Sequence, residues 1–130
     1  MLAACAPPGR SAHEVVSDAL GQAGASTATV ALAVRLYDDG DLPRETARTT
    51  VGAALASAQE AARDLATLEV PGPSASDLRD SALAAVNDAT SVMVTARAVV
   101  SGDADPTIRV ALEDLDRATQ RLQSLEEGNS

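Results

Sequence analysis

The side chains that most often carry out catalysis are few in this chain. His13 is the only histidine, Cys5 is the only cysteine, and Met93 is one of two methionines. A nucleophilic triad needs a histidine beside a serine and a carboxylate in a cleft. A di-metal site in a helical bundle needs Glu-x-x-His pairs, and no such pair is present. We expect His13 to be exposed at a helix start and Met93 to fill the core, too far apart to share a haem. The sequence therefore predicts a non-enzymatic protein without a cofactor or a metal centre.

The only cysteine lies near the start of the chain, after small and apolar residues. Leu2-Ala3-Ala4-Cys5 resembles a bacterial lipobox, the motif at which secreted lipoproteins are cleaved and acylated. The resemblance covers these four residues and implies that Cys5 carries acyl chains and anchors the protein on the outer face of a bacterial cell membrane. The basic and apolar segments that precede a lipobox are missing. We therefore expect the natural start to lie upstream of Met1, or the chain to be trimmed near the cleavage site. The alternative is a cytosolic protein whose cysteine has no such role.

Length, charge and aromatic content narrow the class of protein. A chain of 130 residues has room for one domain. No stretch approaches the roughly 18 apolar residues that a membrane-spanning helix needs. The net charge of -9 and the single aromatic residue, Tyr37, argue against nucleic-acid binding, which needs clustered cations and stacking surfaces. All the basic residues are arginines and alanine is abundant, a bias typical of high-GC bacterial genomes.

Hydrophobic residues recur at alternating spacings of three and four, which predicts four amphipathic helices. We place these helices at residues 11–38, 43–69, 75–101 and 105–126. Short connections between long helices favour an all-α, antiparallel up-down-up-down four-helix bundle. The predicted organisation is a lipobox remnant and flexible tether at residues 1–10, the bundle at residues 11–127, and a disordered tail at residues 128–130.

Sequence signals mark where each predicted helix starts. Ser11 and Glu14 have the spacing of a capping box, in which each side chain accepts a hydrogen bond from the other residue's amide. Proline suits a first helical turn because its missing N–H costs nothing there. The other expected start residues are Pro43, Ser74 or Ser76 as a cap, and Asp105 as a cap with Pro106 as the first helical residue.

Aspartates are concentrated in two predicted connections that begin with Gly-Asp. In an up-down bundle the first and third connections lie at the same end, so we expect an acidic tip far from Cys5. Its members are Asp38, Asp39, Asp41, Asp103 and Asp105. Such a tip could bind a divalent cation or a basic partner, although the ordered loop of a calcium hand is absent. The alternative is that Asp41 and Asp105 are helix caps, the others are solvated, and Arg44 and Arg48 neutralise part of the cluster.

These features favour a non-enzymatic, extracytoplasmic lipoprotein that acts through protein–protein contacts. It would be an accessory subunit or assembly factor of a membrane or envelope complex, or a homodimer. Apolar residues outside the core seams are the expected interface: Leu32, Leu36, Leu55, Leu83 and Val110. Two alternatives stay open, a ligand- or cation-binding helical module and a cytosolic helical dimer.

Overall fold

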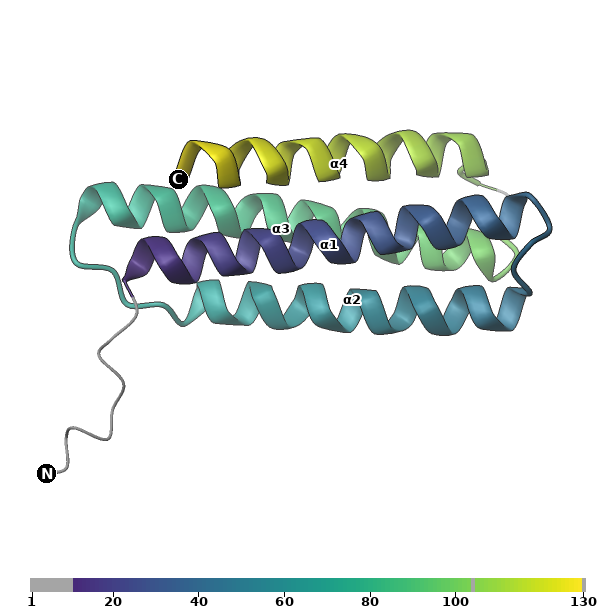
Figure 1. The fold of residues 1–130 in the computed structure, drawn as a ribbon, viewed down its shortest axis with the longest axis horizontal. Helices are drawn as coiled ribbons and strands as arrows, with labels where there is room; N and C mark the ends of the chain where they lie inside the picture. The colour runs from purple at the N-terminus through teal and green to yellow at the C-terminus, as the bar shows by residue number, and fades with distance from the viewer. Residues whose placement is uncertain (1–10, 104, 130) are drawn as a thin grey trace, which may run out of the picture.

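The computed structural model describes residues 11–103 and 105–129. Within these ranges the chain forms four helices and no strand. The helices are α1 (Ala12–Asp38), α2 (Arg44–Ala66), α3 (Pro73–Val100) and α4 (Ile108–Asn129). Figure 1 shows them stacked along a shared long axis and joined by three short connections. The prediction of an all-α fold with four helices is confirmed. Cys5 and the predicted tether lie outside the described residues.

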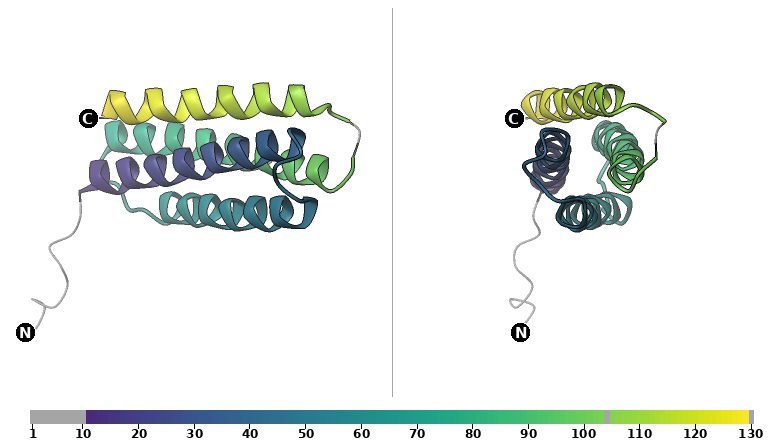
Figure 2. Two further views of the ribbon diagram at one scale, coloured as in Figure 1. Left: turned by 45° about the vertical axis from the view of Figure 1, so that its right-hand side comes forward. Right: turned by 90° about the vertical axis from the view of Figure 1, so that its right-hand side faces the viewer.

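The four helices have a diamond-shaped cross-section. α1 packs against α2, α3 and α4, and α3 also packs against α2 and α4. The end-on view in Figure 2 shows α1 and α3 lying between α2 and α4. Two central helices therefore contact all their neighbours, whereas α2 and α4 each cover one side.

The hydrophobic seams predicted from the sequence form the core. On α1, Val16, Leu20 and Val30 are fully or almost fully buried. Thr27 interrupts this seam, but its hydroxyl donates a hydrogen bond of 2.7 Å to the carbonyl of Ala23, so the buried oxygen has a partner. The buried seam residues of the other helices include many alanines, which allow close helix approach; these residues are Ala47, Val51, Ala54, Ala58, Ala61, Leu65, Ala82, Ala85, Ala89, Met93, Ala96, Leu115 and Leu122.

The start of α1 is the one predicted cap that is confirmed. The hydroxyl of Ser11 accepts from the amide of Glu14, and the Glu14 carboxylate accepts from the amide of Ser11, both at 3.1 Å. The other starts differ by one to three residues. Pro43 occupies the N-cap position, so α2 begins at Arg44 and not at Pro43. α2 also ends at Ala66, with Thr67 as its C-cap, before the predicted residue 69.

Neither predicted serine caps α3, and Asp105 does not cap α4. α3 starts at Pro73 with Gly72 as its N-cap, because proline is favoured in the first turn and moves the start ahead of both serines. α4 starts at Ile108, where the hydroxyl of Thr107 accepts from the amide of Val110 at 3.3 Å. Threonine takes the capping role at this helix start, so Pro106 is not its first residue.

The predicted end of the fourth helix at residue 126 and the predicted disordered tail are wrong for Gly128 and Asn129. Both belong to α4. The side-chain oxygen Oδ1 of Asn129 lies 2.7 Å from Nδ1 of His13. The side-chain nitrogen Nδ2 of Asn129 donates a hydrogen bond to the backbone carbonyl of His13 at 3.0 Å. These contacts between the first and last helices hold the end of α4 on the bundle. Ser130 lies outside the described residues.

Among the described helices, α3 is long and apolar enough to cross a membrane by length and composition alone. The expectation that no stretch approaches this threshold is therefore wrong. α3 nevertheless places Val86, Met93 and Val100 in the core and packs against the other three helices. A buried core helix passes the same compositional test as a membrane-spanning one.

Candidate functional site

Two connections meet at one end of the bundle, which we call the distal end. It consists of residues 38–45 and the described part of residues 97–107. In Figure 1 both connections lie at the right-hand side, opposite the start of α1. A shallow pocket of about 370 Å³ joins them, lined by Tyr37 and Arg44 on one side and by Gly102, Asp103 and Thr107 on the other. The distal end is therefore a continuous surface built from all four helices.

The two connections begin with the same backbone motif. Gly40 and Gly102 have positive φ angles of 81° and 117°, which glycine adopts without a steric penalty. The amide of Asp41 bonds to the carbonyl of Leu36 at 2.8 Å, and the amide of Asp103 bonds to the carbonyl of Ala98 at 3.1 Å. Together with the glycine amides, which bond three residues back, these contacts form a Schellman motif at the end of α1 and of α3. The repeated Gly-Asp pair is thus a helix-stop signal.

The side chains of the acidic tip residues are exposed and make no hydrogen bond or ion pair with other described residues. Asp38, Asp39, Asp41, Asp103 and Asp105 all lie on the surface. Asp41 and Asp105 are not helix caps. Across residues 11–103 and 105–129, no group of three or more histidine, cysteine or acidic side chains could hold a metal ion. The described part of the distal end is therefore an acidic surface.

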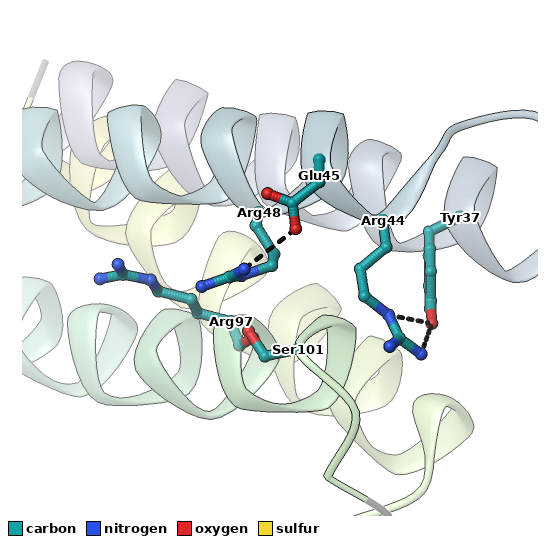
Figure 3. A network of polar contacts seen from close by, with 6 residues as sticks. All are labelled: Tyr37, Arg44, Glu45, Arg48, Arg97 and Ser101. Carbon is teal, nitrogen blue, oxygen red and sulfur yellow. Dashed lines mark hydrogen bonds and ion pairs between the residues drawn. The ribbon is translucent and has the colours of Figure 1, made fainter.

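Arg44 connects the two halves of the distal end through a contact that the sequence did not predict. Its guanidinium donates to the hydroxyl of Tyr37 at 3.1 and 3.3 Å, as Figure 3 shows. The same guanidinium lies 3.9 Å from the position that a Cβ atom would take at Gly102. Arg44 therefore bonds the start of α2 to the end of α1 and lies beside the end of α3, and within the described residues it forms no ion pair with the tip aspartates.

Arg48 and Arg97 lie on α2 and α3 near the same end (Figure 3). Arg48 donates to Glu45, one turn earlier on α2, at 3.0 Å. Within the described residues, the guanidinium of Arg97 makes no hydrogen bond or ion pair, although the Arg97 carbonyl accepts from the hydroxyl of Ser101 at 2.7 Å. No sequence pattern marks Arg97, because its position beside Arg48 depends on how α2 and α3 pack (Figure 3).

The predicted apolar interface residues differ in exposure. Leu32 and Val110 are exposed, at 55% and 36% of their surface. Leu36 and Leu83 are half-buried. Leu55 is only 6% exposed, so its prediction as a surface residue is wrong. α2 packs against both α1 and α3, and its buried face is consequently wider than one heptad seam. Val94, which is 51% exposed, was missed.

Comparison of the chain with protein-family models, curated proteins and solved structures finds no match.

Proposed function

We propose that this chain is a non-enzymatic, extracytoplasmic bacterial lipoprotein, anchored to the cell membrane through acylated Cys5. It acts by protein–protein contact, as an accessory subunit or assembly factor of a membrane or envelope complex. One observation carries the proposal: the five tip aspartates are exposed and form no ion pair with other described residues, at the end of the bundle opposite the start of α1.

We take the bundle as antiparallel and up-down-up-down, and three contacts support this arrangement. Asn129 at the end of α4 bonds to His13 at the start of α1. Arg79 near the start of α3 donates to the carbonyl of Leu68, just after α2, at 3.0 Å. Arg44 at the start of α2 lies beside Gly102, just after α3. Each pair joins the beginning of one helix to the end of another.

This arrangement sets the distance between the proposed anchor and the proposed contact surface. Cys5 is six residues before Ser11, which caps the start of α1. α1 has 27 residues and is therefore roughly 40 Å long at 1.5 Å per residue. A domain anchored at Cys5 would hold its distal end about one helix length away from the segment that carries the lipid. The distal surface would then be accessible to the partner.

The side chains that could do chemistry are used for structure. His13 is bonded to Asn129, and Met93 is fully buried in the core. The pockets described on the surface are shallow and open, including a groove of about 580 Å³ between α1 and α2 that is lined by alanine, serine, threonine and Gln22. No buried side-chain nitrogen or oxygen of the described residues lacks a partner. We therefore favour a binding role over catalysis.

A Cys5→Ser variant tests the anchor, because serine cannot accept the thioether-linked lipid. The protein is expressed from its native gene in its own host, and membranes are separated from soluble material. We expect the natural protein in the membrane fraction and the variant almost wholly in the soluble or secreted fraction. Leu32→Ala, which leaves Cys5 intact, serves as the control and should stay with the membrane. A natural protein that is soluble before any substitution would refute the proposal.

A further inference from the structure

Packing places Arg48 and Arg97 at the same level of the seam between α2 and α3. α2 starts where α3 ends, since Arg44 lies beside Gly102. One turn along α2 from Arg44 is Arg48, and about one turn back along α3 from Gly102 is Arg97. Each arginine directly follows a fully buried alanine, Ala47 and Ala96 respectively. Both side chains therefore leave from the edge of the buried α2–α3 seam (Figure 3), and we call them the arginine pair.

The arginine pair has one acidic partner for its two guanidinium groups. Four other arginines each pair with an aspartate: Arg35 with Asp116, Arg79 with Asp80, Arg117 with Asp114, and Arg121 with Asp88. The arginine pair has Glu45 alone, whose side chain is 82% exposed. Glu45 bonds to Arg48. The Arg97 guanidinium, like those of Arg44, Arg63 and Arg109, has no acidic partner in the described residues, but only Arg97 lies beside a second arginine across the α2–α3 seam (Figure 3). The negative end of α3 offsets part of this positive charge, but Arg97 has no carboxylate acceptor within the described residues.

We infer that the arginine pair is an anion site that binds a carboxylate of the partner protein. A guanidinium presents its N–H donors in a planar fork that matches a carboxylate or phosphate. This inference rests on the proposed function, which also indicates the source of the carboxylate. The pair lies next to the distal end, and the proposed anchor at Cys5 would hold the membrane phosphates at the opposite end of the bundle. The neighbouring aspartates repel a uniformly acidic partner. The complementary surface therefore combines a carboxylate opposite the arginine pair with basic residues opposite the aspartates.

The site is tested by NMR of the arginine side-chain Nε–Hε groups during separate titrations with citrate and inorganic phosphate. We expect citrate to shift the Arg48 and Arg97 signals along a saturating curve. The variant carrying both Arg48→Gln and Arg97→Gln should bind citrate at least tenfold more weakly. The matched control carries Arg63→Gln and Arg109→Gln. These substitutions remove the same charge from two arginines whose guanidinium groups have no hydrogen-bond or ion-pair partner in the described residues, and this variant should bind citrate as the natural chain does.

Two results would overturn the inference. If citrate shifts the Nε–Hε signals of all exposed arginines equally and without saturation, the anion interacts only through the general charge of the protein and the pair is not a site. A saturating response to phosphate without one to citrate would contradict a carboxylate ligand. In the native host, the Arg48→Gln and Arg97→Gln variant should stay in the membrane fraction but lose the proteins that co-purify with the natural chain. Failure of the anchor and failure of the anion site are therefore distinguishable.

Discussion

The two ends of the bundle use their charged residues differently. At the end where α1 starts, Glu14 completes the capping box, and Arg79 pairs with Asp80 and donates to the carbonyl of Leu68. The carboxylate of Glu126 lies against Gly21, where a Cβ atom would be only 3.1 Å away. At the distal end, by contrast, the five tip aspartates are exposed, and the arginine pair has one solvent-exposed carboxylate.

This difference indicates which end is available to a partner. A charge that already caps a helix or crosses to another helix would have to lose that contact before it could bind elsewhere. An exposed charge without such a contact loses only bound water when a partner binds, and this desolvation costs less free energy than breaking an existing contact as well. The contrast predicts that substitutions near the start of α1 affect stability, whereas those at the distal end affect binding.

The largest effect on stability is expected from Leu122→Ala in the half of α4 that lies toward Asn129. Leu122 is fully buried, and truncating a buried leucine costs about 2–5 kcal/mol because it leaves a cavity. Ile108, at the distal start of α4, is only partly buried, so Ile108→Ala should cost less. Urea unfolding followed by circular dichroism measures both. Equal costs would show that the two ends of α4 are packed equally well.

A moderate effect is expected from Asn129→Ala at the end of α4. The substitution removes both contacts with His13, and we expect a loss of about 0.5–1.5 kcal/mol in the free energy of unfolding. Amide hydrogen exchange should also become faster over the last turn of α4. Unchanged exchange there would mean that the contacts with His13 do not hold the helix end.

The smallest effect is expected from Tyr37→Phe at the distal end. The hydroxyl of Tyr37 accepts from Arg44 in an exposed position, where water replaces the lost partner. We expect a change below about 0.5 kcal/mol in the free energy of unfolding. Thermal and urea unfolding beside the natural chain measure it. A loss above about 1 kcal/mol would contradict the view that this end contributes little to stability.

The fold was predictable where one local pattern determined it. The three-and-four spacing identified four helices and most of their buried faces, including Met93, but it missed Leu55, which lies beyond one heptad seam of α2. Helix ends were less predictable because neighbouring signals compete. Ser74 and Asp105 are good caps in isolation. Pro73, however, lets α3 start at an earlier residue than predicted, and Thr107 caps α4 at a later residue than predicted. The repeated Gly-Asp pair was noticed, although its role in ending α1 and α3 needed the backbone geometry.

The candidate site was less predictable because it depends on residues far apart in the sequence. The aspartates could be assigned to one end from the expected topology, and they are exposed there. The packing of α2 against α3 is what brings together Arg44, Arg48 and Arg97, and the sequence alone does not show this packing. The hydrogen-bonded contact between His13 and Asn129 joins residues 116 positions apart, and no local sequence pattern indicates it. Long-range contacts between polar residues leave little signal in a single sequence.

Mass spectrometry of the N-terminal peptide of the protein purified from its host's membranes tests the central claim most directly. The account predicts a peptide that begins at Cys5 and carries the added mass of acyl chains on that residue. A membrane-free protein whose peptide retains Met1 and an unmodified Cys5 thiol would contradict it.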